Sequence, residues 1–331
     1  MFEKITIIGD GAMGSICAML LCEKGLSVTM WGYDAEQLAQ IEAARQNVRF
    51  LPGHKLPEKL LFESRDDKAF AGAGLVVSAV PCQFMRGIWK RLKSYAPPDI
   101  PFVSVTKGIE NTTLLRPSEI LTDVLGPAHD IAVLSGPTIA DEVADKMPAT
   151  ASVASTDDEL AEKVQTAFAT PYFRVYTNDD ILGVELAGAV KNVIAIAAGV
   201  IDGVRAGDNA KAALVSRGLA EIKRLGLAMG AKESTFAGLS GLGDLVTTCI
   251  SPKGRNRSFG ERIGRGLSTA EALKATDSVV EGVATAESVL ALAKRYNIEM
   301  PITEAVHAVI VEDKSVQTAI HDLMTRQLKA E

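Results

Sequence analysis

The sequence predicts an α/β domain followed by an all-helical domain. In the first half, short β-branched runs alternate with helical patterns, which is typical of a mainly parallel sheet covered by helices. After Asp180 the strand patterns stop and helical periodicity takes over. A length of 331 residues is enough for two domains of ordinary size. We therefore expect one domain over residues 1–179 and a second over residues 180–331.

Composition narrows the class of protein. Hydrophobic residues make up 47% and charged residues 23%, as in soluble globular proteins. A net charge of -6 and a pI near 5.4 argue against a nucleic-acid partner. No apolar run reaches membrane-spanning length without a charge or a glycine cluster. The four cysteines form no C-x-x-C pair and no metal-ligand spacing with the four histidines, so we expect no metal, free thiols and a cytoplasmic location.

A glycine motif follows the first predicted strand. Lys4–Ile8 is a β-branched run that leads into G-D-G-A-M-G at residues 9–14, and a helical pattern then continues to Lys24. In such a turn the first glycine permits the tight bend, the second lets a pyrophosphate approach, and the third packs helix against strand. The helix N-terminus adds N–H donors and a partial positive charge. This context predicts a Rossmann-like domain that binds NAD or NADP; the alternative is a purely structural turn.

The next strand, Ser27–Trp31, ends in Gly32-Tyr33-Asp34. An acidic side chain about 20 residues beyond the glycines normally contacts the ribose and favours NAD. Tyr33 occupies that position and Asp34 lies slightly late, so the choice between NAD and NADP stays open.

Further strands are expected, and two of them end in polar motifs. Thr106-Lys107-Gly108 follows one strand and Ser135-Gly136-Pro137-Thr138 follows another. Ligands bind beyond the carboxyl ends of parallel strands, which places Lys107 and Thr138 near a substrate or the nicotinamide. The alternatives are a solvated loop lysine and an ordinary Gly-Pro turn. The expected strands are Leu75–Val80, Phe102–Val105, Ile131–Leu134, Pro148–Ala154 and Tyr172–Tyr176.

The second half opens on a long apolar helix that carries one lysine. Residues 181–204 are rich in Ala, Leu, Ile and Val, and Lys191 lies mid-helix on a face of small residues. Desolvating an ammonium costs several kcal/mol, so a buried lysine is rare unless it is paired or has a function. The alternative is a lysine that extends along the helix to solvent. Further helices are expected at Asn209–Met229, Val283–Tyr296 and Pro301–Val311, and a capping box at Ser268–Glu271 opens another.

Two loops of this half carry candidate groups. Asp244 follows a glycine-rich turn at the start of a predicted helix, and its alternative role is a helix N-cap. Residues 252–257 gather Lys253, Arg255 and Arg257. A solvated basic loop is the usual interpretation, yet arginine beside backbone donors also recognises phosphate.

Taken in order, these motifs resemble a known family. They are G-D-G-A-M-G, T-K-G, S-G-P-T, G-A-V-K-N at residues 188–192, G-L-G-D-L at 241–245, R-N-R at 255–257, V-V-E-G at 279–282 and E-M-P-I-T-E at 299–304. Together, over nearly the whole chain, they resemble the bacterial NAD(P)-dependent glycerol-3-phosphate dehydrogenases.

The resemblance implies roles for individual residues. It implies dinucleotide contacts from Gly9, Gly11, Ala12, Met13, Gly14, Tyr33, Lys107, Ala140, Arg255, Val279 and Glu281. It implies substrate contacts from Lys107, Gly136, Thr138, Lys191, Asp244, Gly254, Arg255 and Asn256. It implies that Lys191 is the catalytic acid/base, assisted by Lys107, Asp244 and Thr248. The chain departs from the family at Gly254, where serine is usual, and at Tyr33, where a basic residue or histidine is common.

The implied reaction is reversible reduction of dihydroxyacetone phosphate to sn-glycerol 3-phosphate, which supplies the backbone of phospholipids. Two other functions remain as alternatives: a related two-domain hydroxy-acid dehydrogenase, whose carboxylate substrate would also need Arg255, and a dinucleotide sensor without catalysis. The expected partner is a small phosphorylated molecule, with no nucleic acid and no membrane span. Apolar helix faces leave two oligomeric states open, a monomer and a homodimer.

Overall fold

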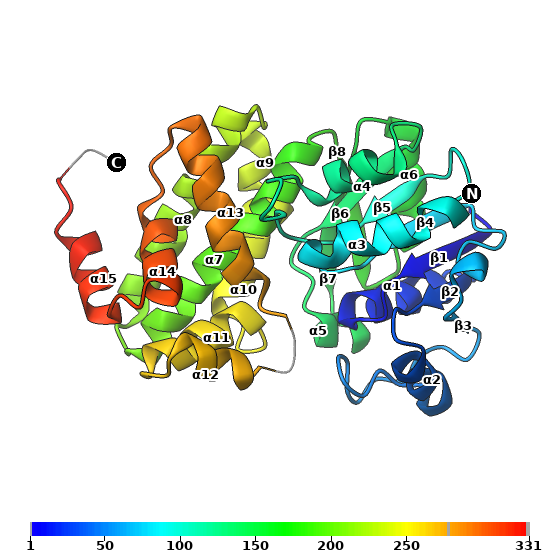
Figure 1. Ribbon diagram of the computed structural model, residues 1–331, viewed down its shortest axis with the longest axis horizontal. Helices are drawn as coiled ribbons and strands as arrows, with labels where there is room; N and C mark the ends of the chain where they lie inside the picture. Colours follow the sequence, from blue (N-terminus) through cyan, green and yellow to red (C-terminus); the bar gives the residue numbers. More distant parts are fainter. Residues whose placement is uncertain (1, 277–278, 329–331) are drawn as a thin grey trace. The chain divides into compact units, whose positions relative to one another are not determined.

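The computed structural model describes residues 2–276 and 279–328 and has two compact units (Figure 1). The first unit comprises Met1–Lys107 and Leu115–Glu185, and the second comprises Gly108–Leu114 and Leu186–Glu331. The change from the first unit to the second therefore falls within helix α7 (Ile181–Gly203).

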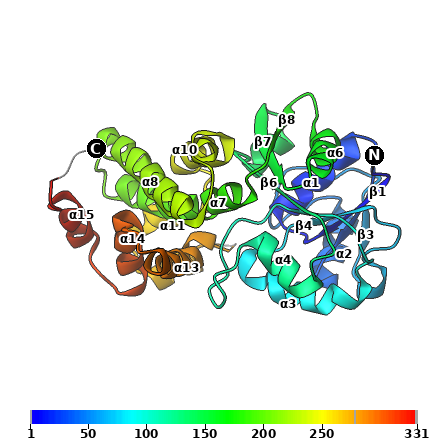
Figure 2. The same ribbon diagram turned by 90° about the horizontal axis from the view of Figure 1, so that it is seen from above.

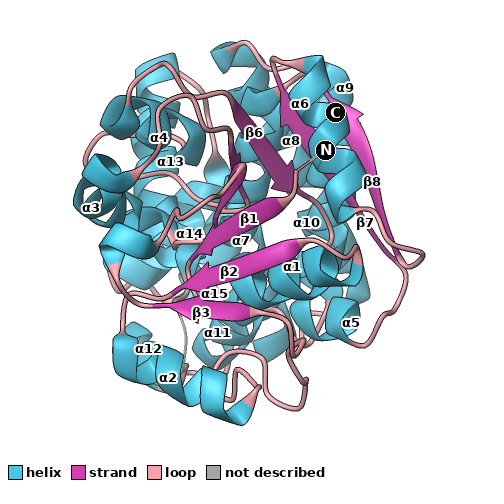
Figure 3. Cartoon of the chain, turned by 90° about the vertical axis from the view of Figure 1, so that its right-hand side faces the viewer, coloured by secondary structure: helices cyan, strands magenta, loops and turns pink. Residues whose placement is uncertain are grey.

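One sheet runs through the first unit in the order β3-β2-β1-β4-β5-β6-β7-β8 (Figure 3). All neighbours pair in parallel except β6 and β7, which are antiparallel, and this confirms the predicted mainly parallel sheet. The first six positions have the strand order of a dinucleotide-binding Rossmann fold. The strands are β1 Lys4–Ile8, β2 Ser27–Trp31, β3 Leu61–Glu63, β4 Leu75–Ser78, β5 Phe102–Ser104, β6 Ile131–Ser135, β7 Ala149–Ser155 and β8 Phe173–Asn178.

Helices cover both faces of this sheet, as continuous buried strands require. The helices of the first unit are α1 Ala12–Glu23, α2 Ala35–Ala44, α3 Cys82–Leu92, α4 Pro117–Leu125, α5 Ala140–Ala144 and α6 Asp158–Phe168, with 3-10 turns η1 Asp66–Lys68 and η2 Lys93–Tyr95. Side chains of α1 and α6 share one apolar cluster, which includes Ile16 and Val164. Those of α3 and α4 share the cluster on the other face, built around Trp89, and these two helices lie side by side (Figure 2).

The described residues of the second unit form helices joined by loops, with no strand. Beyond α7 it contains α8 Asp208–Met229, α9 Glu233–Ala237, the π-helical turn η3 Leu239–Gly243, α10 Asp244–Ile250, α11 Arg255–Gly264, α12 Thr269–Lys274, α13 Glu281–Tyr296, α14 Pro301–Val311 and α15 Val316–Met324. Helix α7 is long and apolar enough to cross a membrane, but 83% of its most apolar window is buried inside the protein. It supplies Val193 and Ile196 to a cluster with α11, α13 and α14, so we interpret it as a core helix.

Glycines let α7 and α11 approach to backbone contact. A Cβ on Gly260 of α11 would stand 2.0 Å from the carbonyl oxygen of Ile196, and one on Gly264 would stand 2.4 Å from that of Val200. A Cβ on Gly199 of α7 would in turn stand 1.9 Å from the carbonyl oxygen of Arg257. Any side chain at these three positions would force the helices apart. The three glycines therefore fix the register in which α7 and α11 pack.

Local sequence signals explain several helix starts. Asp34 and Asp157 accept hydrogen bonds from backbone N–H groups at the starts of α2 and α6. The capping box predicted at Ser268 is confirmed, with Glu271 as its second member. Helix α14 is capped from another helix, because the carboxylate of Glu221 on α8 accepts from the N–H groups of Ile302 at 2.7 Å and Thr303 at 3.3 Å.

Candidate active site

The glycine motif forms the turn between β1 and α1. Gly9 has φ +117°, and a Cβ there would stand 2.7 Å from the carbonyl oxygen of Ala79. A Cβ on Gly14 would stand 2.1 Å from the carbonyl oxygen of Gly9, so helix and turn pack directly. Around Gly11, by contrast, a Cβ would meet nothing within 4 Å. No side chain caps α1 and its first turn holds no acidic residue, so an anion can approach its N–H groups. The cradle fits a pyrophosphate.

The predicted residues of the central strands lie together at the carboxyl end of the sheet. Lys107 follows β5 and donates from Nζ to the carbonyl oxygen of Gly136, 3.0 Å away, beyond β6. The hydroxyl of Thr138 donates to the same oxygen at 3.3 Å. A cavity of about 20 Å³ adjoins Lys107, Thr138 and Met13 of α1. The first unit thus brings these groups close to the glycine turn, as the position of the motifs at the strand ends predicts.

Gly136 is required where it stands. Its φ is +151°, and a Cβ would lie 2.9 Å from both the Cα of Ala151 and the carbonyl oxygen of Thr150 on β7. The antiparallel strand β7 therefore passes against the Gly136 turn, and this contact holds the carbonyl oxygen that Lys107 and Thr138 share. Ala140 is the first residue of α5.

In the second unit, Lys191 is buried and paired. Its side chain is 8% exposed and that of Asp244 is 2% exposed. Nζ of Lys191 donates to Oδ1 of Asp244 at 2.5 Å and to Oγ1 of Thr248 at 2.5 Å. Of the two interpretations that the sequence left open, the buried and paired lysine is the observed one. Such a buried ammonium can deliver a proton to a bound substrate from a fixed position.

The short helix α10 presents Asp244 and Thr248 together. They are four residues apart, hence on one helix face, and Oγ1 of Thr248 lies 3.4 Å from Oδ1 of Asp244. Gly241, in the π turn before α10, would carry a Cβ 2.2 Å from the carbonyl oxygen of Phe236, so only glycine fits there. Asp244 is the first residue of α10 and the helix has no side-chain cap. The alternative that Asp244 serves as the N-cap is therefore wrong.

Two buried amides connect the start of α11 to α7. Nδ2 of Asn256 donates to Oδ1 of Asn192 at 3.0 Å, and Oδ1 of Asn256 accepts from the N–H of Gly282 at 3.0 Å. The residue after Lys191 is thereby tied to the first turns of α11 and α13. The side-chain amide of Asn256 is engaged inside the protein, whereas the family resemblance implied a substrate contact.

The predicted phosphate-binding segment lies at the N-terminus of α11. Arg255 is the first residue of that helix, and Gly254 precedes it without a side chain to cap the N–H groups of the first turn. The Arg255 side chain is exposed, yet the protein around it lowers its pKa by desolvation, and the Glu281 carboxylate opposes that shift. Val279 is 41% exposed and precedes α13, in which Glu281 is the first residue.

The surroundings of Gly254 leave little room for a side chain and already bond to its N–H group. Its N–H donates to the carbonyl oxygen of Ser251 at 3.2 Å, so this donor is already used within the loop. A Cβ at Gly254 would stand 3.2 Å from the carbonyl oxygen of Thr248. A serine here would be tight, and the missing hydroxyl is not replaced by the Gly254 N–H.

Cys249 lies next to Thr248 and is fully buried. Burial raises the pKa of its thiol to about 12, and the nearby Lys191 ammonium only partly opposes the shift. The thiol therefore stays protonated and offers no nucleophile. All four cysteines are free and buried.

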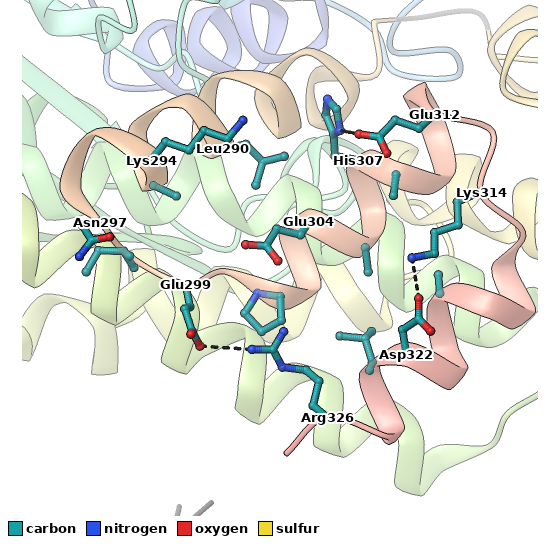
Figure 4. Close-up of a pocket in the computed structure, with 17 residues that line it drawn as sticks. Leu290, Lys294, Asn297, Glu299, Glu304, His307, Glu312, Lys314, Asp322 and Arg326 are labelled. Carbon is teal, nitrogen blue, oxygen red and sulfur yellow. Dashed lines mark hydrogen bonds and ion pairs between the residues drawn. The ribbon is translucent and has the colours of Figure 1, made fainter. Parts of the chain in front are cut away.

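A cavity of the second unit lies away from these groups, between α13, α14 and α15 (Figure 4). It measures about 590 Å³, and none of the predicted site residues lines it. Most of its ionisable side chains pair with one another: His307 with Glu312, Lys314 with Asp322, and Arg326 with Glu299. We assign it no part in the chemistry. Within residues 2–276 and 279–328, no cluster of three His, Cys, Asp or Glu could hold a metal ion.

The sequence analysis missed Asn47. This side chain is 0% exposed and donates to the carbonyl oxygen of Asp10, inside the glycine turn, at 2.8 Å and to Oγ of Ser15, directly after it, at 2.9 Å. It holds the loop of residues 46–60 against that turn. A single buried amide in an irregular loop has no periodicity, so no pattern in the sequence marks it.

Comparisons with known proteins agree with the geometry. A family model described as NAD-dependent glycerol-3-phosphate dehydrogenase N-terminus matches residues 4–161. A second, described as the C-terminus of the same dehydrogenase, matches residues 180–321.

Individual relatives match over nearly their whole length. A protein of Geobacter metallireducens named glycerol-3-phosphate dehydrogenase (NAD(P)+) is 48% identical, over 100% of this chain and 99% of its own. One of the same name from Streptomyces avermitilis is 45% identical, over 99% and 98%. The crystal structure of glycerol-3-phosphate dehydrogenase from Coxiella burnetii superposes with a TM-score of 0.94 at 37% identity, covering 98% of this chain and 99% of that one.

Proposed function

The chain belongs to the NAD-dependent glycerol-3-phosphate dehydrogenase family, and we propose that it reversibly reduces dihydroxyacetone phosphate to sn-glycerol 3-phosphate with NADH or NADPH. The product supplies the glycerol phosphate backbone for phospholipid synthesis. The observation that carries the proposal is the buried Lys191 ammonium, fixed by Asp244 and Thr248.

Lys191 is the proton donor. When bound, the nicotinamide supplies the hydride that reduces the carbonyl carbon. Negative charge then develops on the carbonyl oxygen, and the Lys191 ammonium stabilises that charge and donates its proton. In the direction of oxidation, the neutral amine accepts the hydroxyl proton. Asp244 and Thr248 hold Nζ in one place through both directions.

The phosphate of the substrate binds at the start of α11. The uncapped N–H groups of its first turn provide a partial positive charge and donors, and the Arg255 guanidinium adds a full charge. Asn256 contributes its backbone N–H, because its side-chain amide already bonds to Asn192 and Gly282. The side chain of Asn256 keeps the phosphate site in register with Lys191.

Residues of the first unit hold the cofactor. The open space over Gly11 and the uncapped start of α1 receive the pyrophosphate. Lys107 and Thr138, joined through the carbonyl oxygen of Gly136, supply polar groups at the carboxyl end of the sheet.

The experiment is oxidation of NADH and NADPH by the purified protein, followed at the nicotinamide absorbance. Dihydroxyacetone phosphate should be reduced rapidly, whereas unphosphorylated dihydroxyacetone and the keto forms of hydroxy acids should not. Equal use of the unphosphorylated ketone would exclude the phosphate site, and reduction of a keto acid alone would favour a hydroxy-acid dehydrogenase. Cofactor binding without turnover on any substrate would favour a sensor.

Two variants test the assigned roles. Lys191→Ala should lower kcat by about 10² to 10⁴, the usual contribution of a positioned acid, with cofactor affinity unchanged. Arg255→Ala should raise KM for dihydroxyacetone phosphate about tenfold to a hundredfold, since a charged hydrogen bond contributes about 1.5–3 kcal/mol. Arg265→Ala is the matched control, because this exposed arginine of the same segment pairs with Glu261. Equal KM values for the two arginine variants would refute the phosphate site.

For its setting we propose the cytoplasm and a homodimer. Four buried free thiols support a reducing compartment. The exposed apolar side chains of Met324 (78%) and Leu328 (95%) support association of two chains. Sedimentation velocity at micromolar concentration measures the assembly, and a single monomeric species would exclude the dimer.

A further inference from the structure

A carboxylate lies at the end of β2, where a Rossmann domain contacts the adenosine ribose, and it comes from the glycine turn. A Cβ on Gly32, the residue after β2, would stand 3.1 Å from Oδ2 of Asp10 and 3.3 Å from its Cγ. The Asp10 side chain therefore packs against the end of β2. An acid at this place normally bonds to the 2′-hydroxyl of NAD.

The acid that follows β2 in the sequence is occupied. Asp34 caps α2, and its Oδ1 accepts from the N–H groups of Glu36 at 3.0 Å and Gln37 at 3.2 Å. Tyr33, between Gly32 and Asp34, is 65% exposed and carries no charge at neutral pH. Asp10 is thus the carboxylate left at the end of β2 for the ribose.

Asp10 is held in place on both sides. Nε2 of Gln37 donates to its Oδ2 at 2.7 Å, and its backbone oxygen accepts from Nδ2 of the buried Asn47 at 2.8 Å. Oε1 of Gln37 in turn accepts from Arg49 at 3.2 Å, which orients the amide. The Gln37 amide thus orients the Asp10 carboxylate against the end of β2.

The surrounding charges do not favour an additional phosphate. Arg91 stacks 5.2 Å from the centre of the Tyr33 ring, but Nε and Nη2 both bond to Asp66, at 2.6 and 2.8 Å. Arg49 lies close enough to lower the pKa of Asp10, against the larger effect of burial, which raises it. The three carboxylates of Asp10, Asp34 and Asp66 thus outnumber the two guanidinium groups of Arg49 and Arg91.

We propose that Asp10 makes the protein select NAD(H) over NADP(H), by accepting from the 2′-hydroxyl of the ribose and repelling a 2′-phosphate. This inference rests on the proposed dehydrogenase function and deepens it. Specificity here comes from a repulsive group as well as an attractive one. An arginine near the ribose, free to pair with phosphate, is the arrangement that favours NADP, and Arg91 is already paired with Asp66.

Equilibrium binding tests the inference without turnover. NADH and NADPH are titrated into the wild-type protein, and Kd is measured from the change in nicotinamide fluorescence. We expect NADPH to bind at least about tenfold more weakly, the equivalent of about 1.4 kcal/mol. Competition against NADH should likewise show that 2′,5′-ADP binds more weakly than 5′-AMP. NADPH binding as tight as that of NADH would overturn the inference.

Asp10→Asn removes the charge and keeps an oxygen for Gln37. The ratio of the two Kd values should fall at least fivefold, mainly through tighter NADPH binding. Asp34→Asn is the matched control, since asparagine is an equally good N-cap and the variant removes a neighbouring charge. An unchanged ratio in Asp10→Asn, or an equal change in Asp34→Asn, would refute the role of Asp10. If neither dinucleotide binds the wild-type protein, the proposed function itself fails, a result distinct from both.

Discussion

The pair formed by Lys191 and Asp244 allows a stability prediction that can be worked from the structure. Both side chains are nearly fully buried, and Nζ lies 2.5 Å from Oδ1. Asp244→Leu leaves the ammonium without its counter-charge, and breaking a buried ion pair on one side costs about 3–5 kcal/mol. The lysine can limit that cost by releasing its proton. Keeping a lysine neutral costs about 1.4 kcal/mol for each pH unit by which the solution lies below the ordinary lysine pKa of about 10.4. At about pH 7.5 a buried unpaired ammonium and a buried neutral amine both cost about 4 kcal/mol.

The sign of the pH dependence follows from proton binding. Above about pH 7.5 the neutral amine is the cheaper form in folded Asp244→Leu, whereas the unfolded chain stays protonated up to about pH 10. The unfolded state then binds more protons, so stability rises with pH. Relative to the wild type, the deficit should shrink by about 1.4 kcal/mol for each pH unit between about 7.5 and 10. A deficit independent of pH would show that Lys191 keeps its proton by another route.

Urea unfolding with two probes locates the effect. Both tryptophans, Trp31 and Trp89, belong to the first unit, so their fluorescence follows that unit, while far-UV circular dichroism follows the helices of both. We expect the circular dichroism transition of Asp244→Leu to move to lower urea. A shift confined to the fluorescence transition would refute the assignment of the cost to the second unit.

A double-mutant cycle isolates the pair itself. Lys191→Met also leaves a buried charge, that of Asp244, and should destabilise the protein by a comparable amount. Lys191→Met combined with Asp244→Leu replaces the pair by apolar groups of similar size and should be more stable than either single variant. Additive losses in the double variant would mean that the two groups do not interact as the distance indicates.

Three more outcomes are expected. Gly260→Ala would place a Cβ 2.0 Å from a backbone oxygen of α7 and should cost more than the roughly 1–3 kcal/mol of ordinary overpacking. Gly87→Ala, at an exposed position of α3 where a Cβ would meet nothing within 4 Å, should gain about 0.5–1 kcal/mol. Thermal unfolding compares the two variants. Burial raises the pKa of Glu221 to about 7. Between about pH 4.5 and 7 the folded state therefore holds a proton that the unfolded chain has released, and the stability from this group declines as the pH rises through that range. Glu221→Gln should lack that decline, and equal pH profiles of Tm for the two proteins would contradict it. Native protein should react slowly with Ellman's reagent, because the pKa of the Cys249 thiol is raised to about 12, and rapid reaction of this thiol before unfolding would show that it is accessible.

The strands were the most predictable part of the fold. Lys4–Ile8 and Ser27–Trp31 have the bounds that the sequence indicates, because each is a buried β-branched run that glycines or polar residues terminate. The edge strand β3, Leu61–Glu63, escaped prediction because three half-exposed residues carry no period. Helix α11 escaped for another reason. Its sequence is polar and rich in glycine, and contact with α7 stabilises it rather than intrinsic propensity.

For the candidate site, the sequence indicates the residue types better than their contacts. For a lone lysine in an apolar helix, energetic grounds leave two possibilities, a paired or functional ammonium and a side chain that extends to solvent, and Lys191 has the buried partner of the first. By contrast, nothing in the sequence shows that Asn256 would use its amide inside the protein, or that Asp10 would reach Gly32. Such contacts depend on tertiary geometry, which periodicity does not encode.

The register between α7 and α11 explains why two motifs distant in the chain can serve one substrate. Gly260 packs against Ile196 and Gly264 against Val200, each pair 64 residues apart, and Asn256 bonds to Asn192 at the same separation. The helices therefore run parallel with a fixed offset, which places the first turn of α11 beside the turn of α7 that carries Lys191, the proposed acid. A phosphate at that first turn and a carbonyl at Lys191 are then held at a distance that glycine contacts determine. Changing one glycine far from the chemistry should alter KM and kcat together, because it moves the binding group relative to the proton donor.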